Sequence, residues 1–250
     1  MLEVDINSMV FESSDGTSLQ VLRDLYFQCP INSFTSIVGP SGCGKTTSLR
    51  CIMGLETRYD GKISVTESSD TNTVSKISAV FQEPRLLPWR TVDQNIRLAI
   101  EATGHGGNNH DALDETGLNQ LFEELGLTDH RQFCPQELSL GLARRVALAR
   151  AFAVQPSVLI LDEPFVSLDE ETASRLRKLL ARVWRARSCT ALMVTHNVQE
   201  AIELSDRILF FSSAPSSIVA DYTVPVDRQQ RDSQAVARIT EEIRSLALVG

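Results

Sequence analysis

The sequence predicts a layered α/β protein, and three observations support this fold class. Apolar runs at residues 158–161 and 191–194 are continuous, as in parallel-sheet strands that are covered on both faces. Segments with helical spacing separate the predicted strands, which is the alternation found in layered α/β domains. With 250 residues, 42% hydrophobic and 22% charged, the chain is long and apolar enough for one sizeable domain.

The first predicted element is an antiparallel β segment at the N-terminus. Leu2, Val4 and Ile6 alternate with polar residues, and a turn at 13–16 precedes a second apolar stretch at 21–22. This alternation predicts a sheet with one buried face.

A strand, a glycine-rich loop and a helix are expected next. A β-branched run at 35–38 predicts the strand, and the helix is expected at 46–53, ending before Gly54. The polar stretch at 104–110 is rich in glycine and predicts a mobile surface loop. Further helices are expected at 91–102, around Leu142, Val146 and Ala149, at 171–185, and over Val236, Ile239, Ile243 and Leu246.

Composition excludes several classes of function. The chain has 24 Lys and Arg against 32 Asp and Glu, a net charge of -8, which disfavours nucleic acid as a partner. Its five cysteines are scattered, so neither a disulfide framework nor a zinc site is indicated. The sequence shows no membrane-spanning run and no signal peptide, so a role at a membrane is expected to depend on other chains.

Residues 39–46 match the pattern G-x-x-x-x-G-K-[ST] at the predicted junction of strand and helix. Glycines let successive backbone N–H groups face one centre, and the helix N-terminus adds positive charge, so the loop suits a polyphosphate. Lys45 is expected to neutralise the β and γ phosphates, and the hydroxyl of Thr46 is expected to bind Mg²⁺. A simple glycine turn is the alternative that this context disfavours.

Asp162 and Glu163 directly follow the buried run at 158–161. Two carboxylates are then expected at the carboxyl edge of a parallel sheet, where such sheets bind ligands. Asp162 is expected to hold Mg²⁺ through water, and Glu163 to polarise the water that attacks the γ phosphate. Acidic residues after a strand are commonly surface charges, but the phosphate loop favours the catalytic interpretation.

A resemblance to a known family comes from five features in a fixed order. These are the phosphate loop, a glutamine in Phe81-Gln82-Glu83-Pro84, the segment 138–145 (LSLGLARR), the acidic pair before Pro164 with Ser167-Leu168-Asp169 after it, and His196. The chain resembles an ATP-binding subunit of ABC transporters over nearly its whole length.

The resemblance implies a fold in more detail. It predicts a P-loop NTPase (RecA-like) α/β core with a mixed sheet, an antiparallel N-terminal β subdomain and an α-helical subdomain at roughly 86–152. Residues 1–250 are expected to form a single nucleotide-binding domain, without a separate C-terminal regulatory domain.

The resemblance also implies roles for single residues. Glu163, His196 and Gln82 are expected to be catalytic, and Asp169 to communicate across a dimer interface. Phe11 is the candidate for stacking on adenine, with core packing as the alternative. The expected metal-binding residues are Thr46, Gln82 and Asp162, and the expected ATP-binding residues are Phe11, Gly39, Pro40, Ser41, Gly42, Cys43, Gly44, Lys45, Thr46 and Thr47.

The segment Ser139 to Leu142 departs from the usual Leu-Ser-Gly-Gly-Gln signature of this family. Leu140 replaces the first glycine and Leu142 the glutamine, whereas Ser139 and Gly141 are retained. These four residues are expected to meet the ATP bound by a partner subunit, with Ser139 as the N-cap of a helix. We expect a working site with altered affinity or turnover; a module that senses ATP without hydrolysing it is the alternative.

Residues 84–89 are similar to the equivalent stretch of importer ATPases for nitrate, sulfonate and taurine. Leu86, Leu87 and Trp89 are expected either to form an apolar platform for a helix of a membrane subunit or to be buried within this chain.

The expected function is that of an ATPase subunit of an ABC importer. Two copies, or one copy and a homologous ATPase, sandwich ATP head to tail, and Mg²⁺-dependent hydrolysis drives transport by transmembrane permease subunits. A solute-binding protein is expected as an indirect partner, nucleic acid is not, and the location is the cytoplasmic side of the membrane. A soluble ABC-type or other P-loop ATPase is the rival, and the transported solute is not encoded here.

Overall fold

The computed structural model describes residues 1–12, 17–66, 76–103, 112–187 and 189–247. The chain forms two compact units, of which the first combines Met1–Ser75 with Thr190–Gly250 and the second is Lys76–Cys189. The turn expected at 13–16 and the loop expected at 104–110 lie outside the described residues.

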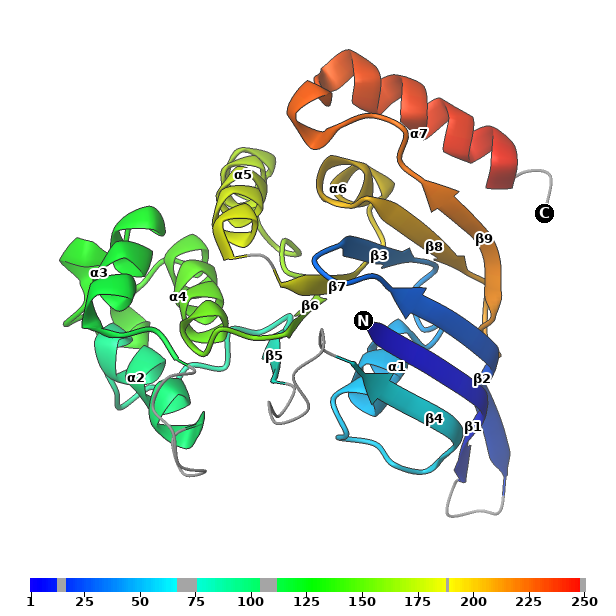
Figure 1. Ribbon diagram of the computed structural model, residues 1–250, viewed down its shortest axis with the longest axis horizontal. Helices are drawn as coiled ribbons and strands as arrows, with labels where there is room; N and C mark the ends of the chain where they lie inside the picture. Colours follow the sequence, from blue (N-terminus) through cyan, green and yellow to red (C-terminus); the bar gives the residue numbers. More distant parts are fainter. Residues whose placement is uncertain (13–16, 67–75, 104–111, 188, 248–250) are drawn as a thin grey trace. The chain divides into compact units, whose positions relative to one another are not determined.

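The first unit contains the expected antiparallel sheet. Strand β1 (Leu2–Glu12) lies between β2 (Ser18–Cys29) and β4 (Tyr59–Val65) and is antiparallel to both (Figure 1). Leu2, Val4 and Ile6 are fully buried. The alternation of apolar and polar residues therefore follows the two faces of the sheet.

The first unit also contains a sheet of mixed direction, as expected. Strand β3 (Phe34–Val38) lies between β7 (Thr190–Thr195) and β8 (Arg207–Phe211) and is parallel to both. The next strand is β9 (Ile218–Thr223), antiparallel to β8. Every residue of β3 and β7 is buried, which explains the continuous apolar run at 191–194.

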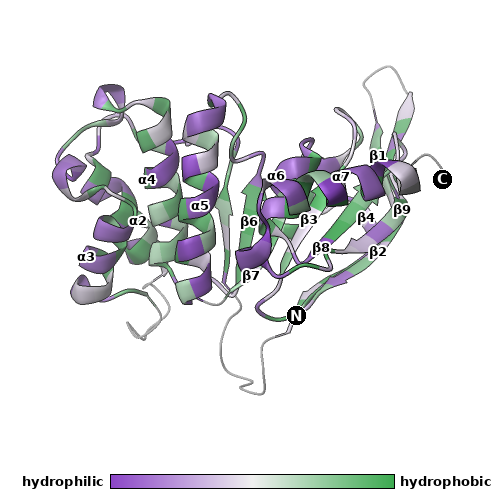
Figure 2. Cartoon of the chain, turned by 90° about the horizontal axis from the view of Figure 1, so that it is seen from above, coloured by the Kyte–Doolittle hydropathy of each residue, from purple (hydrophilic) through white to green (hydrophobic). Residues whose placement is uncertain are grey.

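The described residues of this unit also form α1 (Lys45–Ile52), α6 (Val198–Leu204) and α7 (Ser233–Ala247), with a 3₁₀ turn at Arg228–Gln230. Val236, Ile239 and Ile243 of α7 are buried in one cluster with Ile208 of β8. In Figure 2, β3 and β8 are hydrophobic, whereas α6 and α7 carry hydrophilic residues. The apolar stripe of the last helix is therefore its core-facing side.

The second unit is mainly helical. Among its described residues, β5 (Ile77–Val80) and β6 (Val158–Asp162) are parallel neighbouring strands. Its α-helices are α2 (Val92–Thr103), α3 (Glu115–Glu124), α4 (Leu140–Ala153) and α5 (Glu170–Arg187), with 3₁₀ turns at Thr128–His130 and Pro135–Glu137. The helical subdomain at 86–152 and the single-domain organisation stay predictions.

Within the described parts of the chain, the helices fall short of the length and apolar character that crossing a membrane requires.

Candidate functional site

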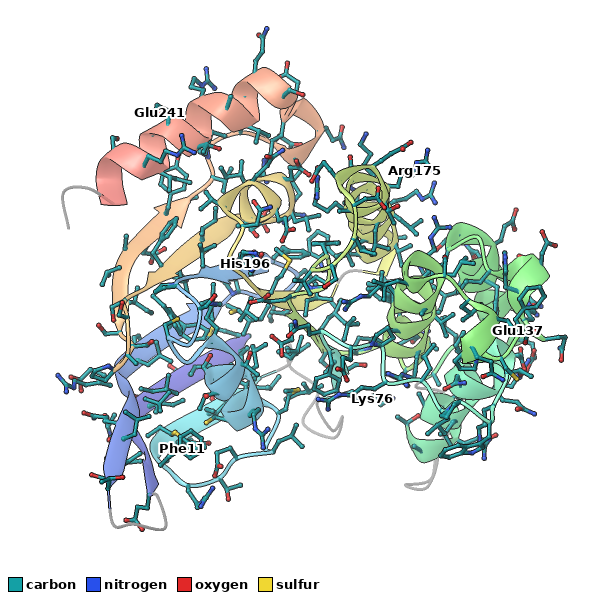
Figure 3. All side chains as sticks on the ribbon, turned by 180° about the vertical axis from the view of Figure 1, so that it is seen from behind. Phe11, Lys76, Glu137, Arg175, His196 and Glu241 are labelled. Carbon is teal, nitrogen blue, oxygen red and sulfur yellow. The ribbon has the colours of Figure 1, made fainter. Side chains whose placement is uncertain are left out.

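In the first unit, two predicted site segments leave the same edge of the mixed sheet. The parallel register of β3 and β7 pairs Val38 with Thr195. Gly39, which opens the phosphate loop, and His196 are the next residues on these strands. Because parallel strands point their carboxyl ends to one side, the structure brings these two residues together. His196 is exposed beyond the end of β7 (Figure 3).

Two glycines of the phosphate loop adopt conformations that other residues rarely reach. Gly42 has φ 76° and Gly44 has φ 109°. A Cβ atom on Gly44 would lie 2.9 Å from Cγ1 of Val21 and 3.0 Å from Cδ2 of Leu22. The turn therefore needs glycine both for its backbone angle and for its close approach to β2.

The Lys45 side chain folds back along this loop. Its ammonium group donates hydrogen bonds to the carbonyl oxygens of Gly39 and Pro40, each at 2.8 Å, and only 5% of the residue is exposed. Gly44 is the N-cap of α1, and among the described residues no side chain caps this helix. The loop thus presents a fixed cation and the positive end of a helix at one place, an arrangement that suits phosphate.

Ser216, which the sequence analysis did not single out, donates a hydrogen bond to the backbone of the phosphate loop. The hydroxyl of Ser216 is buried and donates to the carbonyl oxygen of Cys43, 173 positions away in the chain. The hydroxyl of Ser48 donates to the carbonyl oxygen of Lys45 at 2.7 Å. Ser216 carries no local signal, because only the folded chain brings it to Cys43.

Phe11, the candidate for adenine stacking, lies near the end of β1 (Figure 3). It is half-buried, and the antiparallel register places it opposite Leu19, of which 62% is exposed. Directly opposite residues of antiparallel strands share a face, so these two side chains lie beside each other. This exposure is compatible with stacking and leaves the role of Phe11 a prediction.

In the second unit, the glutamine and the acidic pair also leave one sheet edge. The parallel register of β5 and β6 pairs Val80 with Leu161. Gln82 is exposed two residues beyond Val80, and Asp162, 7% exposed, follows Leu161. The structure thus brings the amide of Gln82 and the two carboxylates to the same end of two neighbouring strands.

The backbone turns sharply at the second acidic residue. Glu163 has φ 44°, in the left-handed region, and the N–H of Val166 donates to its carbonyl oxygen at 3.3 Å. Asp169 follows this turn and caps α5, because its carboxylate accepts from the N–H of Thr172 at 2.9 Å. This backbone hydrogen bond is the main reason why the pKa of Asp169 lies below its usual range.

The signature segment forms the start of α4. Ser139 is the N-cap, as predicted, and its hydroxyl oxygen accepts from the N–H of Leu142 at 3.3 Å. Leu140 is 41% exposed, so a side chain fits where the family usually has glycine. A Cβ on Gly141 would lie 3.1 Å from Cγ2 of Thr172 on α5. Packing within the chain therefore favours glycine at position 141 but not at position 140.

Arg144, one turn further along α4, is a second residue that the sequence analysis missed. It is buried, and its guanidinium donates to the carbonyl oxygens of Phe81 and Val166, both at 3.2 Å. Burial lowers its pKa. Arg144 belongs to the segment 138–145, but its role cannot be predicted from that segment because its two acceptors are 63 and 22 positions away.

Part of the proposed apolar platform is open to solvent. Trp89 is 73% exposed, whereas Leu86 and Leu87 are half-buried. Within the described chain, Trp89 is therefore not part of the core, and the role of the two leucines stays a prediction.

The residues expected at a magnesium ion carry suitable donors. A hydroxyl (Thr46), an amide oxygen (Gln82) and a carboxylate (Asp162) are hard oxygen ligands, which Mg²⁺ prefers. Thr46 belongs to the first unit, and Gln82 and Asp162 belong to the second. Over the residues that the structure describes, no cluster of three or more His, Cys, Asp or Glu side chains could hold a metal ion.

The glycine loop joins the buried strand β3 to helix α1, whose N-terminus has no side-chain cap among the described residues, and Lys45 donates a hydrogen bond to Gly39 at the start of the loop. These features define a phosphate-loop nucleotide-binding protein. The profile described as ABC transporter matches residues 22–166. The chain belongs to the ABC transporter family. The expected family, fold class and class of ATP-binding protein are thereby confirmed.

Relatives of nearly equal length support this assignment. The chain is 39% identical over 214 residues to aliphatic sulfonates import ATP-binding protein SsuB 1 of Pseudomonas savastanoi pv. phaseolicola. The aligned residues cover 85% of this chain and 84% of the relative. The chain is 35% identical over 246 residues to SsuB of Bacillus cereus, with 97% and 94% covered.

Solved structures agree with the fold. A dimeric post-hydrolysis structure of an ATP-binding cassette, bound to ADP and Pi, matches with a TM-score of 0.74 at 23% identity, over 91% of this chain and 100% of that chain. A dimeric bacterial ABC transporter cassette matches with the same values. At this level of identity the likeness concerns the fold.

Proposed function

We propose that this chain is the ATP-hydrolysing subunit of an importer for aliphatic sulfonates or a similar small solute such as nitrate or taurine. The observation that carries the proposal is its similarity, at 39% identity over 85% of the chain, to a protein named for aliphatic sulfonate import. The complete set of nucleotide motifs supports it further.

ATP binding is assigned to the first unit. The phosphates meet the N-terminus of α1, which Gly44 leaves without a side-chain cap among the described residues. Lys45 is already held at the loop by two hydrogen bonds and can turn its ammonium group to the β and γ phosphates.

Hydrolysis is assigned to the residues at the sheet edges together with Thr46 of α1. Thr46, Gln82 and Asp162 fit Mg²⁺, which would neutralise negative charge on the phosphate oxygens. Glu163 orients the attacking water, and His196 donates a hydrogen bond to the γ phosphate. Glu163 has a left-handed backbone conformation, so the turn sets the direction in which its side chain leaves the backbone.

A second copy, or a homologous ATPase, completes the proposed site. Ser139 can accept from Leu142 and still donate its proton, so its hydroxyl is available to a phosphate of the partner subunit. Asp169 lies after the acidic turn and is assigned to the same interface. Hydrolysis removes these contacts between subunits and separates them.

The proposed membrane partners are transmembrane permease subunits, with the chain bound peripherally on the cytoplasmic side. The exposed indole of Trp89 supports a docking surface for a permease helix. A solute-binding protein is assigned as an indirect partner, on the analogy of the importer group.

The test is transport by the assembled complex in lipid vesicles. We expect uptake of a labelled alkanesulfonate to require Mg²⁺ and ATP on the side of this chain, with phosphate released in step. Uptake of labelled nitrate and of labelled taurine is measured in parallel, to compare these solutes with the alkanesulfonate. A complex that binds ATP but releases no phosphate would contradict the proposal and favour the ATP-sensing alternative.

A further inference from the structure

The buried guanidinium of Arg144 joins three segments of the second unit. Arg144 lies on α4, five residues after Ser139, and is 3% exposed. One nitrogen, Nη1, donates to the carbonyl oxygen of Phe81, and the other, Nη2, donates to that of Val166. Burying a charge is costly, and these two hydrogen bonds offset part of the cost, whereas the buried Nε has no partner among the described residues. Loss of either carbonyl contact would raise the cost further.

Each acceptor lies close in sequence to a proposed catalytic residue, since Phe81 directly precedes Gln82 and Val166 is three residues after Glu163. The carbonyl of Phe81 is part of the planar peptide that leads into Gln82. Val166 closes the turn that begins at Glu163, since its N–H donates to the Glu163 carbonyl. The guanidinium is itself planar and rigid, so it fixes the separation and the orientation of both peptide groups.

A second arginine of α4, Arg150, also donates hydrogen bonds to the segment that follows Gln82. Arg150 donates to the carbonyl oxygens of Pro84 at 2.9 Å and Arg85 at 2.8 Å. The guanidinium of Arg85 lies 4.3 Å from the centre of the Phe81 ring. Helix α4 therefore holds the glutamine segment at two points, and of these two arginines Arg144 is the one that also bonds the acidic turn.

We propose that Arg144 is a positioning residue for ATP hydrolysis, which sets Gln82 and Glu163 relative to each other and to the helix that begins at the signature. This inference rests on the proposed function. Attack on a phosphate needs an oriented water, and a displacement of about 1 Å can cost about a hundredfold in rate. ATP affinity is assigned to the phosphate loop, so loss of Arg144 affects the chemical step rather than binding.

The test compares Arg144→Met with Arg144→Lys in the full chain, assembled with its permease subunits. Phosphate release gives kcat, and a fluorescent ATP analogue gives the dissociation constant. For Arg144→Met we expect kcat to fall about a hundredfold and the dissociation constant to change less than about twofold. A lysine keeps the positive charge but lacks the two planar N–H groups that reach both carbonyl oxygens. We therefore expect kcat of Arg144→Lys to be about tenfold higher than that of Arg144→Met.

The control is Arg182→Met. Arg182 also donates to a backbone carbonyl of the second unit, that of Glu124 at 2.8 Å, but it is exposed on α5. Its loss should leave kcat unchanged. If Arg144→Met unfolds, as thermal melting would show, Arg144→Lys decides by the same two constants.

An Arg144 variant that is folded and keeps the wild-type kcat, or that loses ATP binding in parallel with kcat, would overturn the inference. A wild-type complex that hydrolyses no ATP would instead overturn the proposed function, so the two failures are distinguishable.

Discussion

The phosphate loop and the signature segment both lead into a helix, but the two helices differ in how their N-termini are capped. At α1 the N-cap is Gly44, without a capping side chain in the described structure. At α4 the hydroxyl of Ser139 already accepts from the N–H of Leu142. The first helix start is thus left for a ligand, whereas the second is largely satisfied by the chain itself.

The surroundings of the two starts differ in the same sense. Gly44 and Gly42 have positive φ, and Lys45 donates to a carbonyl oxygen of the loop, so contacts within the chain set the conformation of the phosphate loop. Leu140 is exposed beside Ser139, so the signature presents an apolar surface as well as a hydroxyl. We therefore propose that affinity for ATP resides in the first helix start and that the second adjusts turnover.

The largest expected effect is that of Glu163→Gln, which removes hydrolysis and leaves both helix starts intact. Turnover should fall about a thousandfold, because the attacking water is no longer polarised. ATP binding should persist, and ATP with Mg²⁺ should trap a stable dimer. Phosphate release and size-exclusion chromatography measure these outcomes; a variant that stays active and monomeric would contradict the role of Glu163.

Lys45→Ala tests whether affinity resides in the first helix start. Loss of a charged donor at the phosphates should weaken ATP binding about a hundredfold, measured by calorimetric titration. Lys62→Ala removes an exposed lysine of β4 and is the matched control, expected to bind like the wild type. Equal affinity of the two variants would end the assignment of binding to this loop.

Gly44→Ala and Gly42→Ala separate the two reasons for glycine in the loop. At Gly42 no described heavy atom lies within 4 Å of an added Cβ, so only backbone strain of about 1 kcal/mol is expected. At Gly44 the close contacts with Val21 and Leu22 add to the strain, and the loss should reach about 3 kcal/mol. The free energy of unfolding in denaturant measures both, and equal losses would contradict the packing argument.

The smallest expected effect is that of Leu142→Gln, which restores the polar residue usual in the family. One regained hydrogen bond to a partner-bound nucleotide should raise turnover of the assembled complex about threefold to tenfold. Leu55→Gln changes an exposed leucine of the first unit and should have no effect. Unchanged turnover in Leu142→Gln would mean that Leu142 does not meet the nucleotide.

Much of the fold followed from local patterns. The helices expected at 46–53, 91–102 and 171–185 are observed as α1, α2 and α5, with ends shifted by at most two residues. Helices α3 and α6 and strands β4, β5, β8 and β9 were not predicted. Strand β5 is an example, because its four residues give too short a pattern, and its pairing with β6 decides its conformation.

By itself, the sequence determined the phosphate loop, the acidic pair after a buried strand and the serine cap of α4, because backbone sterics and hydrophobic period act over a few residues. Only the tertiary structure decided that Ser216 supports Cys43 and that Arg144 joins Phe81 to Val166. These contacts span 173, 63 and 22 positions. A buried donor takes whichever carbonyl group the packed chain brings to it, and local sequence does not encode that choice.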